Sequence, residues 1–240
     1  PFHVQRTFTR VMGISPREYQ DARRLERLKK ELKDDRSVTY SLYEAGFGSS
    51  SRLYEGAKLG MTPLTYGRGG KGMTIRYTIV ESPLGRLLLA ATERGVCRVG
   101  MGDHVAALAA DLREEFPAAE IERNDAALRA WSNALIKYTN GRLPHPELPL
   151  DIRATAFQKR VWETLKKIPL GETKSYSEVA RLVGKPRAAR AVARACASNP
   201  VALIIPCHRV VRDDGSLGGY HWGIGRKEKL LAREKDVARA

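Results

Sequence analysis

The stretch Ile204-Ile205-Pro206-Cys207-His208-Arg209-Val210-Val211 places a thiol beside an imidazole, between aliphatic residues and before an arginine. A free thiol is mostly protonated at neutral pH, so a nucleophilic cysteine needs a nearby base or positive charge to lower its pKa. His208, Arg209 and Arg212 are candidates. If the stretch is a strand, neighbouring side chains point to opposite faces, and His208 reaches the sulfur only through a water or after a turn at Pro206. A buried, unreactive cysteine is the alternative interpretation.

The five residues from Pro206 to Val210 resemble the active-site motif of the O6-alkylguanine-DNA alkyltransferases, and the resemblance extends from Phe157 to Glu234. It implies a helical, winged-helix-like catalytic and DNA-binding domain, which we place at residues 153–240. It also implies a small ribonuclease-H-like α/β subdomain at residues 73–152, which serves as a scaffold without a direct catalytic role. The expected fold class is therefore α+β.

The same resemblance implies a role for each of five residues. Cys207 would accept the alkyl group, and His208 would make it a thiolate through a bridging water. Glu234 would hold the imidazole in the useful tautomer and stabilise its charged form. Tyr176 would donate to a ring nitrogen of the guanine, and Asn199 would brace the turn before Cys207. From the residues alone, the charged run 226–236 favours a solvated helix face for Glu234, and a core position with a satisfied hydroxyl is the alternative for Tyr176.

The resemblance further implies direct repair of O6-alkylguanine, and of O4-methylthymine, by irreversible transfer to Cys207. An alkylated base inside a duplex is reached only after it flips out of the stack. The substrate pocket is expected to include Pro206, Val210, Tyr220 and His221. Because a thioether is stable and neither a cofactor nor a metal site is indicated, each molecule is expected to act once.

A helix-turn-helix is predicted before this motif. Residues 175–178, Ser-Tyr-Ser-Glu, form a capping box for a helix through Leu182, and Pro186 opens a recognition helix that ends near Ala197. The DNA-binding residues expected on it are Arg187, Ala189, Arg190 and Arg194. The resemblance to the alkyltransferases implies that Arg190 would fill the place of the flipped base. An alanine-rich helix that is simply well packed is the alternative.

The N-terminal part contains a second DNA-binding pattern. The opening residues 2–8 predict a helix already under way, so we expect an upstream part to be missing, and Ser15-Pro16 predicts a helix start. Three phrases resemble the AraC-type DNA-binding domain: Ala45-Gly46-Phe47, Ser50-Ser51-Arg52-Leu53-Tyr54 and Leu59-Gly60-Met61-Thr62-Pro63. We assign residues 1–66 to this segment, with Arg52 as a DNA-contacting residue and a helix from Val38 to Ala45, and residues 67–72 to a glycine-rich linker.

The region between the two basic ends contains no recognisable catalytic motif. Strands are predicted at residues 75–80, 86–91 and 96–101, forming an antiparallel meander, and helices at 105–116 and 126–138. The net charge is +6 for residues 1–72, −2 for 73–152 and +11 for 153–240. Basic residues gathered at both ends favour two DNA-binding parts joined by a scaffold.

The three cysteines, Cys97, Cys196 and Cys207, have unrelated spacings, which predict neither a disulfide framework nor a zinc site. Cys97 is expected in the core. No apolar run reaches the length of a membrane span, so we expect a cytoplasmic, nucleoid-associated protein.

Together, the two resemblances indicate an Ada-type regulator and methyltransferase without the zinc domain that precedes these parts in that family. Its expected partners are alkylated double-stranded DNA and, for regulation, promoter DNA and RNA polymerase, with the protein itself a monomer. One alternative is a non-catalytic transcription regulator that recognises alkylated DNA, although Cys207 argues against it. A papain-like hydrolase is excluded because the Cys-Gly-Ser/Ala-Cys-Trp/Tyr signature is absent.

Overall fold

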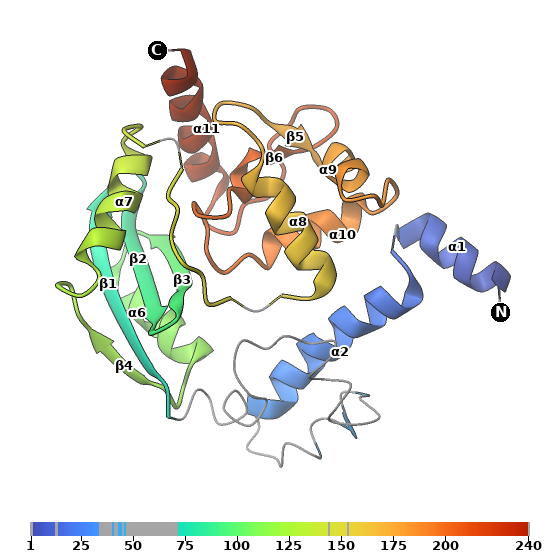
Figure 1. Ribbon diagram of the computed structural model, residues 1–240, viewed down its shortest axis with the longest axis horizontal. Helices are drawn as coiled ribbons and strands as arrows, with labels where there is room; N and C mark the ends of the chain where they lie inside the picture. Colours follow the sequence, from blue (N-terminus) through green and yellow to red (C-terminus); the bar gives the residue numbers. More distant parts are fainter. Residues whose placement is uncertain are drawn as a thin grey trace.

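The computed structural model describes residues 2–12, 14–33, 40, 43–44, 46, 72–143, 145–152 and 154–239. It combines helices with a small sheet, which confirms the expected α+β class (Figure 1). Within the described residues no helix has the length and apolar character that crossing a membrane requires.

A four-stranded sheet lies in the middle of the chain, in the order β3-β2-β1-β4. Its strands are β1 (Thr74–Ser82), β2 (Gly85–Thr92), β3 (Gly95–Gly102) and β4 (Glu120–Arg123). The first three pair antiparallel, which confirms the predicted meander. Strand β4 pairs parallel with β1 and was not predicted, because four residues with one aliphatic side chain give no period-2 signal.

Both faces of this sheet are buried, because successive side chains of β2 point to opposite sides. Leu88 and Ala90 join a cluster with helix α6 (Val105–Glu115). Leu87 and Leu89 join the main core, together with helix α7 (Arg129–Thr139) and the C-terminal helices. The sheet therefore forms one wall of the core that carries the motif around Cys207.

The C-terminal region, residues 154–239, contains the elements that position this motif. They are α8 (Ala156–Lys166), β5 (Lys174–Ser175), α9 (Tyr176–Leu182), α10 (Ala189–Ala197), the 3₁₀ helix η1 (Cys207–Arg209), β6 (Val210–Val211) and α11 (Ile224–Arg239). The predicted capping box is present, since Ser175 Oγ accepts from the backbone of Glu178 and the carboxylate of Glu178 accepts from the backbone of Ser175. Helix α10 begins three residues later than we predicted, because Pro186 and Arg187 form a turn.

Two helices, α1 (Phe2–Met12) and α2 (Pro16–Lys33), confirm the predicted opening helix and the start at Pro16. The ring of Tyr19 packs edge-on against Phe8 at 5.4 Å, and the guanidinium of Arg194 on α10 lies 5.7 Å from the centre of the same ring. Arg52, most of the predicted helix 38–45 and linker residues 67–71 lie outside the described residues.

Candidate active site

Cys207 lies at the start of a tight turn and not in a strand. Its backbone N–H bonds the carbonyl of Ile205 at 2.8 Å, and the backbone then follows the 3₁₀ helix η1. The strand that the aliphatic flanks suggested is wrong for this residue, because Pro206 turns the chain and pairing begins only at Val210. The chain thus turns at Pro206, as one of the two alternatives required. Cys207 and His208 both lie in the buried 3₁₀ helix that follows.

Cys207 is 5% exposed, and its thiol contacts Asn199. The Nδ2 group of Asn199 lies 3.3 Å from Sγ and donates to the carbonyl of Ile205 at 2.8 Å, while its Oδ1 accepts from the backbone of Val201 at 3.1 Å. The same turn holds Leu203 at φ 73°, a conformation that side chains other than glycine rarely adopt. Asn199 thus contacts the turn at Val201 and Ile205 as well as the thiol.

Burial raises the pKa of Cys207, and this outweighs the hydrogen bond from Asn199 and the charge of Lys227, which both lower it. The resting acceptor is therefore a thiol that needs a base. His208 supplies one, because burial lowers the pKa of its imidazole and keeps it neutral.

The imidazole of His208 is fully buried against Glu234. Its Nε2 lies 2.8 Å from Oε1 of Glu234. The carboxylate also accepts from Arg209 in a bidentate pair, with Nε to Oε2 at 2.9 Å and Nη2 to Oε1 at 2.9 Å. Burial raises the pKa of Glu234, but its partners outweigh burial and lower the pKa to about 2. His208, by its hydrogen bond and its charge in acid, lowers this pKa most, followed by Arg209, which is always charged.

These contacts fix the proton on the imidazole. An ionised carboxylate only accepts hydrogen bonds, so Nε2 of His208 carries the hydrogen and Nδ1 remains an acceptor. Nδ1 is buried, and among the residues that the structure describes none is its hydrogen-bond partner. A free basic nitrogen one residue from a protonated thiol is the arrangement that general-base activation through a water requires.

One prediction about charge near the thiol needs correction. Arg209 was a candidate for lowering the pKa of Cys207, but its guanidinium pairs with Glu234 and donates to the carbonyl of Ile168 at 2.5 Å. The cation that acts on the thiol is Lys227, which is 1% exposed on α11. Its Nζ donates to the carbonyls of Val210, at 2.6 Å, and of Leu217.

A residue that the sequence did not indicate completes the cluster. Tyr138, on α7 of the sheet region, donates to Oε1 of Glu234 at 2.5 Å and lies 3.2 Å from Nε2 of His208. We expected residues 73–152 to contribute no side chain to the active site, and the structure differs from this expectation at Tyr138. The only sequence signal at Tyr138 is the apolar spacing of a helix, which does not distinguish it from a core residue.

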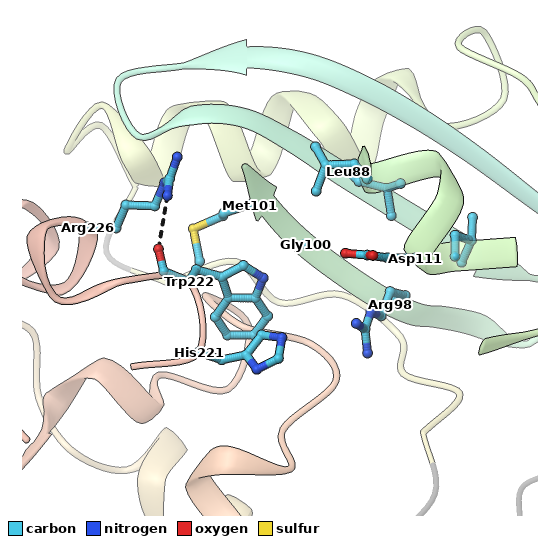
Figure 2. A pocket seen from close by; sticks show the side chains of 10 residues that line it. Leu88, Arg98, Gly100, Met101, Asp111, His221, Trp222 and Arg226 are labelled. Atoms are coloured by element: carbon cyan, nitrogen blue, oxygen red, sulfur yellow. Dashed lines mark hydrogen bonds between the residues drawn. The ribbon is translucent and has the colours of Figure 1, made fainter. Parts of the chain in front are cut away.

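The predicted pocket residues divide between two sides. Pro206 and Val210 are buried on either side of Cys207 and His208 in the sequence. Tyr220 is partly buried, and among the described residues its buried hydroxyl has no hydrogen-bond partner; charge on Cys207 raises its pKa. His221 instead lies on the wall of a cavity of about 250 Å³ between the sheet and the loop before α11 (Figure 2). In that view Arg226 donates to the carbonyl of Trp222 at 3.0 Å.

Tyr176, at the start of α9, is half-buried, and burial raises the pKa of its hydroxyl, which is therefore a donor. A side-chain carbon added at Gly218 would lie 3.3 Å from this hydroxyl, so the loop needs glycine at this close approach. The loop that leads to Tyr220 thus passes directly beside Tyr176.

The arginines of the recognition helix are exposed. Val192 and Ala195 pack inward, Ala189 is half-buried, and the side chains of Arg190 and Arg194 reach solvent, with Arg187 on the turn before the helix. This leaves one basic face, of which Arg194 lies against Tyr19.

Comparison with known proteins places this geometry in a family. Residues 156–236 match the model of the 6-O-methylguanine DNA methyltransferase DNA binding domain, residues 75–152 that of the ribonuclease-like domain of the same enzyme, and residues 1–69 a helix-turn-helix domain.

Named relatives agree. The chain is 46% identical to the bifunctional transcriptional activator/DNA repair enzyme Ada of Escherichia coli, over 98% of this chain and 67% of that protein. It is 45% identical to the methylated-DNA--protein-cysteine methyltransferase of Methanosarcina barkeri, over 68% of this chain and 99% of that protein. Among solved structures, Mycobacterium tuberculosis OGT in complex with DNA matches at 37% identity and a TM-score of 0.58, covering 68% of this chain and 94% of that one. The chain therefore belongs to the 6-O-methylguanine-DNA methyltransferase family, in the Ada-type arrangement with a helix-turn-helix segment before the methyltransferase.

Proposed function

We propose that this protein repairs DNA by transferring the alkyl group of O6-alkylguanine to Sγ of Cys207, once per molecule. The observation that supports it best is the buried turn in which a protonated thiol precedes a neutral imidazole with a free acceptor nitrogen. The relatives named above as methylated-DNA cysteine methyltransferases support the same reaction.

The chemistry follows from the hydrogen positions. A water passes the proton of Cys207 to Nδ1 of His208, and Glu234 stabilises the resulting imidazolium. The thiolate attacks the alkyl carbon, a C–S bond forms, and the C–O bond breaks with its electron pair moving into the guanine. Tyr176 donates to a ring nitrogen of the departing base, which limits the charge that develops on it. Asn199 keeps Sγ in place throughout.

Reaching the base requires duplex DNA to be opened. Arg187, Arg190 and Arg194 would contact phosphates and the stack, Ala189 would allow close approach of the backbone, and Arg190 would occupy the gap left by the flipped nucleotide. Pro206, Val210, Tyr220 and His221 would shape the pocket, and O4-methylthymine is a second substrate that it would accept.

The domain division that fits this function is residues 1–66 for the AraC-type segment, 67–72 for the linker, 73–152 for the scaffold and 153–240 for the catalytic domain. Similarity to Ada and the helix-turn-helix match support a role in transcription regulation. The same proposal includes binding of promoter DNA through Arg52 and contact with RNA polymerase. It also includes a monomeric state and a location at the nucleoid in the cytoplasm. The alternative of a non-catalytic regulator is disfavoured by the buried Cys207, His208 and Glu234.

A mass measurement tests the reaction. Incubated with an excess of duplex containing O6-methylguanine, each chain should gain one methyl group and no more. Repair of more than one base per chain would contradict the single-turnover acceptor and favour hydrolysis.

Replacing Arg190 by alanine should slow repair in duplex DNA far more than reaction with free O6-benzylguanine, because only the duplex requires a flipped base. The two single-turnover rates give the comparison, with Arg181→Ala, an exposed arginine on α9, as the control. Equal losses on both substrates would remove the flipping role from Arg190.

A further inference from the structure

Tyr138 carries a hydroxyl from the sheet region into the buried cluster of the C-terminal region. It is 4% exposed, and burial raises the pKa of its hydroxyl well above the ordinary value, so it keeps its proton at any working pH. That single proton is donated to Oε1 of Glu234 at 2.5 Å. The same oxygen accepts from Nε2 of His208 at 2.8 Å.

The carboxylate therefore serves three donors with two oxygens. Arg209 bonds both oxygens, and Tyr138 and His208 compete for Oε1. A donor that holds an oxygen reduces the negative charge available to the other donors at that oxygen. Tyr138 thus limits how strongly Glu234 holds the imidazole.

The position of Tyr138 is set where the C-terminal end of α7 and the turn after it contact α11. After α7 the chain turns at Gly141, with φ 72°, and a side-chain carbon there would lie 2.6 Å from Cγ2 of Val237. Next to Tyr138, the carbonyl of Thr139 accepts from Nη1 of Arg233. Two close contacts with α11 therefore hold the end of α7 that carries the hydroxyl.

We propose that Tyr138 is a positioning residue for the transfer reaction, which orients Glu234 from the scaffold side and competes with His208 and Arg209 for Oε1 of Glu234. The inference rests on the proposed function. It gives the sheet region a part in the reaction, although Tyr138 touches neither thiol nor substrate.

The effect on pH dependence follows from the groups around the imidazole. Glu234 and Lys227 face it from α11, Arg209 from η1, and Tyr138 from α7. Removing the Tyr138 hydroxyl leaves Oε1 to His208 and Arg209, so the carboxylate holds the imidazolium more strongly. The pKa of His208 should then rise, and His208 should be protonated, and unable to act as a base, up to a higher pH.

The test compares Tyr138→Phe with wild type and with Tyr77→Phe, a matched change of a buried tyrosine on β1 that faces α6. Titration of the His208 imidazole, followed by ¹⁵N NMR and assigned with a His208→Asn variant, should shift upward by roughly one pH unit in Tyr138→Phe, the size of one ordinary hydrogen bond. It should not shift in Tyr77→Phe. The acid side of the single-turnover rate profile should move by the same amount, so that on this side the rate falls about tenfold.

Other outcomes would overturn the proposal. An unshifted titration and rate profile would show that the hydroxyl does not act on the pair. A rate that falls equally at all pH values, together with a lower melting temperature, would assign Tyr138 a purely structural role. The titration needs no substrate, so a wild-type protein that transfers no methyl group would refute the proposed function while the titration still tests Tyr138.

Discussion

Replacement of Cys207 by alanine should abolish methyl transfer and leave the affinity for DNA largely unchanged. Transfer is lost because no other group in the buried turn can form the thioether. DNA binding should persist because the phosphate contacts that we propose come from the exposed arginines on and before α10, whereas Cys207 is buried. Intact mass after exposure to O6-methylguanine duplex measures the first effect, and fluorescence anisotropy at one fixed salt concentration measures the second.

The other two cysteines provide controls. Burial raises the pKa of Cys196 well above its ordinary value, and Sγ of Cys97 donates to the carbonyl of Ala90 in the sheet. Cys97→Ala and Cys196→Ala should each still gain one methyl group, and peptide mapping of wild type should find it on Cys207. A Cys207→Ala protein that still removes methyl groups from DNA would refute the acceptor assignment.

Replacement of Arg209 by methionine should lower the free energy of unfolding by about 3–5 kcal/mol, because it leaves the carboxylate of Glu234 buried without its fixed counter-charge. Glu234 is 4% exposed and Arg209 is 2% exposed, so water cannot compensate. Urea unfolding at pH 7 measures the loss. Arg76→Met breaks a pair with Glu122 whose side chains are both 44% exposed, and it should cost less than about 1 kcal/mol.

The pH dependence of the stability lost in Arg209→Met gives a second check that the lost charge pair is the cause. The pKa of Glu234 is lowered to about 2, so the stability that Arg209 provides is fully present above the ordinary glutamate value and is lost as the pH falls towards 2. The deficit of Arg209→Met should therefore shrink in acid. Adding Glu234→Leu should restore much of the stability at pH 7 without restoring fast transfer, because His208 then lacks its acceptor. A deficit that is independent of pH would show that lost packing, not charge, accounts for it.

Local signals in the sequence predicted most of the elements correctly. The capping box at Ser175 set the first residue of α9, and Ser15-Pro16 set the start of α2. The alternation in β1 to β3 was long enough to predict the meander. In each case the residues that decide the element lie within a few positions of one another, which is the range over which periodicity and capping act.

The contacts of the site were harder to predict because they join distant residues. Arg209 and Glu234 are 25 residues apart, and Tyr138 and Glu234 are 96 apart. A charged residue within the polar stretch 226–236 looks like a solvated helix position until α7 and η1 are known to cover it. The family resemblance supplied the role of Glu234, whereas Tyr138 and the pairing of Arg209 emerged only from the fold.

The burial of Cys207 also affects how long a molecule that has not yet reacted keeps a reactive thiol. Peroxides and adventitious electrophiles attack thiolates far faster than thiols, and they attack exposed sulfurs first. Cys207 is 5% exposed and its thiol is protonated at rest, so both burial and protonation protect the sulfur from these reagents. In a protein that reacts once, this packing determines how long the thiol stays reduced and unalkylated before the protein meets a damaged base.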